Sequence, residues 1–133
     1  MKDKIFADSN IVVYVFDKKT TKQTISREII KAQPVISSQV IIESLNVCIR
    51  KLKFSKEKAY KNSLLLFKFC EYHSLETSTF IKAYSISEKY GYTHLDSLII
   101  ASSLEAECSV LYTEDMQHNQ LIEKKLRIIN PFL

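Results

Sequence analysis

Short apolar stretches alternate with longer segments of helical period along this chain of 133 residues. The stretches that we expect to be strands are residues 4–7, 34–36, 74–76, 108–113 and 126–130. Strands that alternate with helices are typical of a parallel sheet covered on both faces. We therefore expect an α/β fold with a central parallel sheet, formed as a single domain over residues 1–133.

The helices are expected where capping residues precede helical periodicity. They begin at Asp8 or Ser9, cover 20–32, run from Ser37 or Ser38 to 52, begin again at Ser55, cover 77–90 up to Gly91, run from Thr93 to 107, and include a short one before the last strand. With one glycine and two prolines in the chain, we expect short loops and mostly helical structure.

The composition excludes several classes of protein. Hydrophobic residues make up 46% of the chain, which is enough for a packed core. No apolar stretch approaches the roughly 20 residues of a membrane span. The segment MKDKIFADSN lacks the features of a secretion signal, so we expect a cytoplasmic protein. Three cysteines in the chain, with no CxxC pair, predict reduced and mostly buried thiols.

Four acidic residues stand where an ionised carboxylate is costly. Asp8 and Asp115 each follow an expected strand, whereas Glu43 and Asp96 interrupt the apolar face of an expected helix. The carboxyl ends of parallel strands meet at one edge of a sheet, so these carboxylates can converge. Asp96 alone would be explained by its place in the first turn of a helix. Together, the four predict a shared hard cation such as Mg²⁺.

Two polar residues can support such a metal site. Asn10 follows Asp8 by two positions, and Thr113 precedes Asp115 by two, so each can orient a carboxylate. Equally, both can be ordinary cap or turn residues. Glu114 can replace Asp115 as a ligand or face solvent, and we favour Asp115.

Basic residues gather in two stretches, 18–27 and 50–61. Such stretches are often only solvated helix faces, but beside an acidic metal site they suit a polyanionic substrate. The candidate substrate contacts are Arg50, Lys51, Lys53 and, close to Asp115, His118. Nearby aromatic residues such as Tyr60 and Phe67 can stack on bases or form core or dimer contacts.

At these residues the chain resembles the PIN domain family, and within it the VapC-type toxin ribonucleases. The segments that carry the resemblance are IFADSNIVVY, SSQVIIESLNV, YTHLDSLIIASSLEAE and VLYTEDMQH. The resemblance implies a three-layer α/β/α sandwich and an endoribonuclease that uses Mg²⁺ or Mn²⁺ to hydrolyse RNA. It assigns metal binding to Asp8, Glu43, Asp96 and Asp115, with Asn10 and Thr113 in support. It also implies a homodimer and a cognate antitoxin protein.

Two features depart from the family pattern. The residues after Asp115 are MQHNQ where relatives often have a glycine, and Glu114 adds a negative charge beside the site. A catalytically inactive PIN-like module that binds RNA or protein is the main alternative. A DNA substrate is a lesser one. Phosphotransfer domains fit poorly. A haloacid-dehalogenase-like phosphatase needs a second acid where this chain has Asn10. A response-regulator receiver needs a paired acid before the first strand-end aspartate and a phosphoacceptor aspartate at mid-chain, and this chain has neither.

Overall fold

The centre of the computed structural model, which describes residues 3–133, is a mostly parallel sheet. Met1 and Lys2, the start of the segment MKDKIFADSN, lie outside the described residues. The strands are β1 (Ile5–Ala7), β2 (Val35–Ser37), β3 (Glu71–His73), β4 (Val110–Tyr112), β5 (Leu121–Ile122) and β6 (Leu126–Ile129). Their order is β3-β2-β1-β4-β6-β5, and only β5 is antiparallel to its neighbour.

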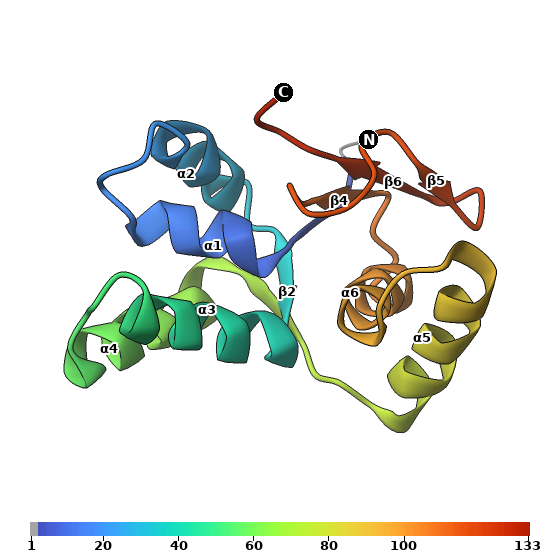
Figure 1. Ribbon diagram of the computed structural model, residues 1–133, viewed down its shortest axis with the longest axis horizontal. Coiled ribbons are helices and arrows are strands. Elements are labelled where there is room, and N and C mark those ends of the chain that lie inside the picture. The colour runs from blue at the N-terminus through green and yellow to red at the C-terminus, as the bar shows by residue number, and fades with distance from the viewer. Residues whose placement is uncertain (1–2) are drawn as a thin grey trace.

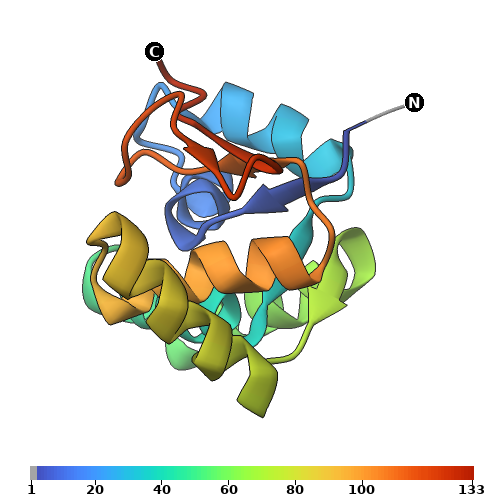
Figure 2. The same cartoon turned by 90° about the vertical axis from the view of Figure 1, so that its right-hand side faces the viewer.

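Helices lie on both faces of this sheet. They are α1 (Ser9–Phe16), α2 (Gln23–Lys31), α3 (Ser38–Arg50), α4 (Lys56–Phe69), α5 (Thr77–Tyr90) and α6 (His94–Glu105). Figure 1 shows α1 and α3 running together from the centre of the molecule toward one end. In Figure 2, α2 lies above the strands and α6 below them, with α5 packed outside α6. The predicted three-layer α/β/α fold is confirmed.

Three helices begin directly after a serine or threonine whose side chain caps them. Ser37, Ser55 and Thr93 each accept a hydrogen bond from a backbone N–H of the first turn of α3, α4 and α6. Gly91 ends α5 with a φ of 79°, a left-handed conformation that glycine adopts at little cost. These local signals explain why the predicted starts of α3, α4 and α6 are correct. Helix α2, predicted over 20–32, begins instead at Gln23, after Lys22, which makes no capping hydrogen bond.

Helix α6 has the longest continuous buried stretch of the described helices. Residues 97–103 of this helix are all buried, because α6 lies between the sheet and α5. Phe6, Ile36 and Leu111, from three adjacent strands, are also fully buried. Asp96 stands at the start of this helix, so the surrounding packing holds its position. The three cysteines are buried free thiols, as predicted.

Two predicted elements are wrong. The third strand is Glu71–His73, directly before the predicted 74–76, because Ser74 and Glu76 form the capping region of α5 instead. The short helix before the last strand is absent from the described chain, where β5 and β6 form a hairpin. Glu123 and Lys124 both have positive φ, as in the type I′ turns that suit hairpins.

Helix α4 presents its larger apolar side chains to solvent. Ala59, Ser63 and Leu66 form its buried side. Tyr60, Leu64 and Phe67, which follow one another at helical spacing, are exposed. In the part of the chain that the structure describes, no helix combines the length and hydropathy needed to cross a membrane.

Candidate metal and catalytic site

Asp8 and Asp115 follow β1 and β4 at the point where these two strands end side by side. Ala7 pairs with Tyr112 at the carboxyl end of these strands, and the Asp8 N–H donates to the Tyr112 carbonyl at 3.1 Å. After β1 the chain forms β2 and β3 on one side of β1 within the sheet, and it later forms β4 on the other side of β1. The gap between β1 and β4 is therefore a topological switch point. Open α/β sheets bind ligands at such points.

Asp8 is almost fully buried, with 4% of its surface exposed. Its carboxylate accepts hydrogen bonds from the Ser9 N–H at 2.7 Å and from the Thr113 hydroxyl at 2.8 Å. Burial nevertheless raises the pKa of Asp8 from 3.8 to about 7, and the negative charges of Glu43 and Asp115 add to the shift. Among residues 3–133, no positively charged side chain pairs with the Asp8 carboxylate.

Asp115 is joined to Asp8 through two polar side chains. The Asn10 amide donates to the Asp115 carboxylate at 2.9 Å and to the Thr113 hydroxyl at 3.3 Å. The Asp115 N–H also donates to that hydroxyl, at 3.2 Å. Asn10 and Thr113 thus connect the ends of β1 and β4, and they orient both carboxylates.

Glu43 and Asp96 approach the same edge from two helices. The pKa of Asp96 is raised by burial and by the charges of Asp115 and Glu43, just as Glu43 and Asp115 raise that of Asp8. Asp8 and Asp96 are therefore both within range of the negative charges of Glu43 and Asp115. Residues more than a hundred positions apart in the sequence come together here.

Gln39 belongs to this site, although the sequence did not point to it. Its amide N–H₂ donates to the Glu43 carboxylate at 3.3 Å and to the Leu95 carbonyl at 3.0 Å. Gln39 stands one helical turn before Glu43, a spacing at which side chains on a helix meet. That spacing is the signal that could have found it. Gln39 links the helix of Glu43 to the helix of Asp96.

The donor chemistry fits a hard cation. The site offers carboxylate oxygens, and the buried amide oxygens of Asn10 and Gln39 have no hydrogen-bond partner among residues 3–133. Across those residues, no three His, Cys, Asp or Glu side chains stand close enough together to bind one ion directly. Mutual repulsion favours such spacing, and an ion with bound waters can bridge it.

Glu114 faces away from the other acids. Its carboxylate pairs with the Lys22 ammonium at 2.6 Å and accepts a hydrogen bond from the Tyr14 hydroxyl. Lys22 also lies 5.0 Å from the centre of the Tyr14 ring and 5.2 Å from that of Phe132. Thr113 and Asp115 contact the other site residues, whereas Glu114, in the bend that follows β4, contacts Tyr14 of α1 and Lys22 just before α2.

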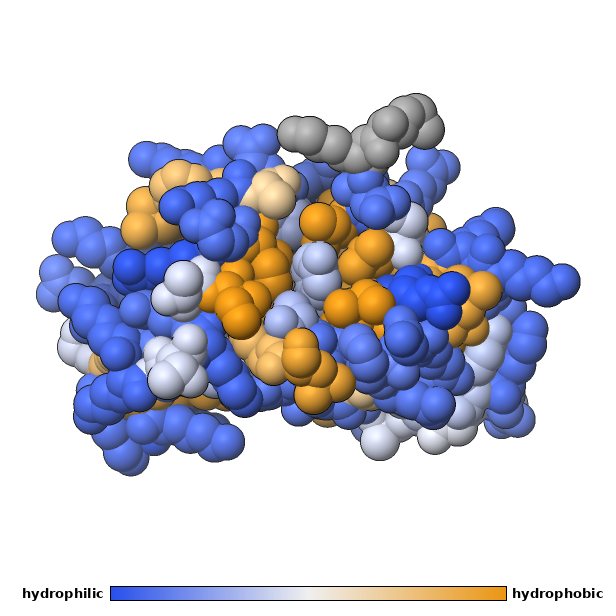
Figure 3. All heavy atoms as spheres, turned by 90° about the horizontal axis from the view of Figure 1, so that it is seen from above, coloured by the Kyte–Doolittle hydropathy of each residue, from blue (hydrophilic) through white to orange (hydrophobic). Residues whose placement is uncertain are grey.

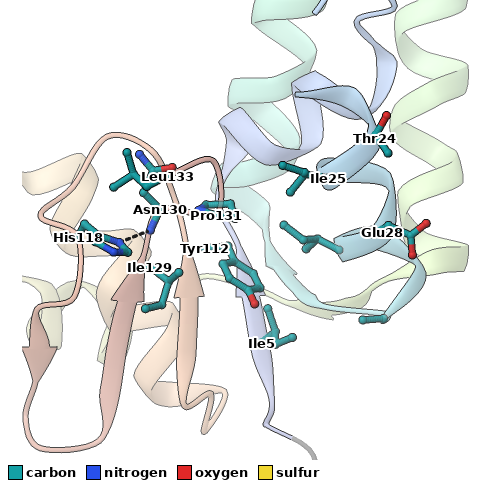
Figure 4. Close-up of a pocket in the computed structure, with 12 residues that line it drawn as sticks. Ile5, Thr24, Ile25, Glu28, Tyr112, His118, Ile129, Asn130, Pro131 and Leu133 are labelled. Carbon is teal, nitrogen blue, oxygen red and sulfur yellow. Dashed lines mark hydrogen bonds between the residues drawn. The ribbon is translucent and has the colours of Figure 1, made fainter. Parts of the chain in front are cut away.

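The predicted substrate contacts lie in different places. Figure 4 shows His118 at a hollow of about 600 Å³ between α2 and the sheet, where its Nδ1 accepts from the Asn130 N–H at 2.9 Å. This hollow is mostly apolar, and Figure 3 shows apolar side chains gathered in the middle of the same face. Lys51 and Lys53 instead line a basic hollow near the end of α3, and Arg50 is exposed close by.

Comparison with protein families gives one extended match. A model described as the PIN domain matches residues 5–124. A comparison with curated protein sequences gives no significant match.

Solved structures share the fold at low sequence identity. VapC20 of Mycobacterium tuberculosis, a sarcin-ricin loop cleaving toxin, is 12% identical with a TM-score of 0.70, covering 84% of this chain and 90% of that one. A toxin–antitoxin complex from Klebsiella pneumoniae is 15% identical with a TM-score of 0.72, covering 96% and 97%. VapBC2 from Rickettsia felis, bound to a promoter DNA fragment, is 19% identical with a TM-score of 0.63, covering 93% and 96%.

Proposed function

Because this chain belongs to the PIN domain family, we propose that it is a metal-dependent endoribonuclease and the toxin of a type II toxin–antitoxin pair. The observation that carries the proposal is the set of four mutually repelling carboxylates at the junction of β1 and β4. Repulsion and burial disfavour their charged forms, and a divalent cation would reverse that preference. The proposal places the enzyme in the cytoplasm with its RNA substrate.

The residues divide into ion-holding and orienting roles. Asp8, Glu43, Asp96 and Asp115 would hold Mg²⁺ or Mn²⁺, which supplies an activated water and neutralises charge on the phosphodiester. Thr113 and Asn10 hold Asp8 and Asp115 in register by hydrogen bonds, and Gln39 does the same for Glu43. The buried Asp8 is held away from bulk water, so its proton affinity stays high until a cation binds. The carboxylates thus provide the site, and their neighbours provide its geometry.

We also propose a protein partner that covers apolar surface. An apolar hollow of about 270 Å³ between α1, α2 and α4 is lined by Val15, Phe16, Ile30, Leu65 and Phe69, among others. Antitoxin complexes are among the structural neighbours, which supports an antitoxin at this chain as well. Exposed Phe80, Ile81 and Tyr84 on α5 offer a second apolar surface, suited to a homodimer.

The deciding experiment is RNA cleavage by purified protein with Mg²⁺ or Mn²⁺, with and without EDTA. We expect cleavage that EDTA abolishes and that Asp96→Asn lowers by at least about 100-fold. Glu107→Gln is a matched control, because Glu107 is an exposed acid outside the site. It lies two residues after the end of α6. Intact RNA in every condition, or equal cleavage by Asp96→Asn, would refute a nuclease.

The alternative is an inactive PIN-like module that binds RNA or protein. The spacing of the four carboxylates is the observation that favours this alternative, because no three of them form a close ligand set within residues 3–133. Calorimetry separates the two functions. A nuclease binds Mn²⁺ and loses that binding in Asp8→Asn, whereas the inactive module shows no Mn²⁺ binding in either form.

A further inference from the structure

A second charged site lies at the far end of α1 and α3 from the acids. The turn after α1 and the turn after α3 stand together at one end of the molecule (Figure 1). Between them is a hollow of about 410 Å³, lined by Lys18, Lys19, Lys51, Lys53 and Lys58 together with Phe16, Asp17, Leu52 and Phe54. We call it the lysine hollow. It unites two basic stretches that are far apart in the sequence.

The charges of the lysine hollow are uncompensated. None of its five lysines forms an ion pair with a carboxylate among residues 3–133, whereas Lys4, Lys22, Lys31, Lys82 and Lys89 do. Of the described residues, Asp17 is the one acid that lines the hollow, and its carboxylate accepts a hydrogen bond from the backbone N–H of Lys19. Five positive charges against one negative charge repel one another unless an anion joins them.

The local structure keeps lysines here at a cost. Lys53 adopts a φ of 59°, a left-handed conformation that glycine or asparagine takes more easily. Lys58 lies in the first turn of α4, where the helix dipole disfavours a positive charge. Its ammonium instead rests 4.0 Å from the centre of the Phe54 ring. The dipole at the end of α3 explains Lys51 but not these two residues.

The chemistry of the lysine hollow suits phosphate rather than bases. Lysine ammoniums are point charges that bind phosphate oxygens without reading base edges. One face of the Phe54 ring, which could have stacked on a base, is occupied by the Lys58 ammonium. The hollow is therefore suited to the backbone of a nucleic acid, independent of sequence.

Its position connects it to the acid site. Helix α1 begins next to Asp8 and ends next to Asp17, so about nine residues at ~1.5 Å per residue separate the two sites by roughly 13 Å. We propose that the lysine hollow binds backbone phosphates of a single-stranded RNA that extends beyond the acid site. The location of the bond to be cut rests on the proposed function; the RNA binding itself does not.

The test compares two sets of charge-removing substitutions, both made in an Asp8→Asn background. Because it measures binding, the test does not depend on RNA cleavage. The first set is Lys18→Gln, Lys51→Gln and Lys53→Asn, with asparagine chosen for the left-handed backbone. The control set is Lys61→Gln, Lys68→Gln and Lys125→Gln, which removes equal charge from exposed positions outside the hollow. The probe is fluorescein-labelled oligouridine, and its binding is measured by anisotropy at several salt concentrations.

The first set should weaken binding by roughly 10-fold at low salt and make the slope of log affinity against log salt shallower by about 2, at ~0.7 per lost phosphate contact. Each single substitution should lower the slope by about 0.7, so the test survives if the triple variant fails to fold. Arginine at the same three positions should keep the slope of the background. The control set should do the same.

Equal loss in both sets would overturn the proposal, because it would show only a general effect of net charge. Unchanged oligouridine binding in the first set would overturn it as well. If the first set instead lost binding to a fluorescein-labelled polyglutamate peptide while oligouridine binding stayed intact, the hollow would be a site for an acidic protein. A wild-type protein that cleaves no RNA would refute the proposed function but not this result.

Discussion

Asp8 and Glu105 are two carboxylates that join distant segments, yet their surroundings shift their pKa values in opposite directions. Burial raises the pKa of Asp8 to about 7, and the hydrogen bonds from the Thr113 hydroxyl and the Ser9 N–H do not offset this. Burial also acts on Glu105, but hydrogen bonds from Ser78, Thr79 and His73 outweigh it and lower the Glu105 pKa.

The difference separates an acid whose charge the fold satisfies from one in the candidate site. Glu105 ties the end of α6 to β3 and to the start of α5, and its charge is satisfied within the fold. Asp8 also holds the ends of β1 and β4 together, but burial disfavours its charged form. Proteins tolerate such a cost where function requires it, which is why the poorly satisfied acid marks the candidate site.

The largest expected effect comes from Asp8→Asn in metal-free protein. Between pH 3.8 and about 7, folded wild type retains a proton on Asp8 that the unfolded chain releases, so its stability falls as pH rises. The neutral asparagine side chain lacks this penalty. The variant should therefore gain stability relative to wild type with rising pH, by roughly 4 kcal/mol above pH 7. Urea unfolding at pH 4 and pH 8 measures the gain.

Metal provides the matched control for that measurement. Mn²⁺ should raise the free energy of unfolding of wild type and leave the Asp8→Asn variant nearly unchanged. A variant that is no more stable than wild type at pH 8 would mean that the Asp8 charge is already satisfied, and the contrast with Glu105 would disappear.

The next effect in size is the loss of stability in Glu105→Gln. Because the Glu105 pKa is lowered, its contribution is present above the unfolded value of 4.5 and is lost as pH falls through the folded value. We expect a loss of about 1–2 kcal/mol at pH 7 that shrinks in acid, with RNA cleavage unchanged. Guanidinium unfolding at pH 7 and pH 3 checks it. A cleavage defect as large as that of Asp96→Asn would contradict a purely structural role.

The smallest expected effect concerns Glu114. Unlike Asp8 and Glu105, this acid is paired with a lysine, Lys22. Lys22→Met should leave an unpaired carboxylate next to Asp115 and lower cleavage by several-fold. That is less than the about 10- to 100-fold typical of losing a partner of a metal ligand. Glu114→Gln added to the same chain should restore most of the rate. Steady-state kinetics of the single and double variants measure the rescue, and a double variant as slow as the single one would show that the charge is not the cause.

Much of the fold could be predicted because its signals are local. Ser37, Ser55 and Thr93 cap helices through hydrogen bonds within one turn, and Gly91 ends α5 by its own conformation. The failures have tertiary causes. The hairpin of β5 and β6 depends on non-glycine residues with positive φ, and the start of β3 depends on its pairing with β2.

By itself, the sequence determined the alternation of strands and helices, the residues that cap the helices, and the four acids that follow or interrupt apolar segments. These features depend on neighbours within a few positions, where spacing and side-chain chemistry act directly. Only the tertiary structure decided that Gln39 supports Glu43, that Glu114 turns toward Lys22, and that two basic turns share one hollow. The outcome there depends on which side chains the sheet order and helix packing bring together.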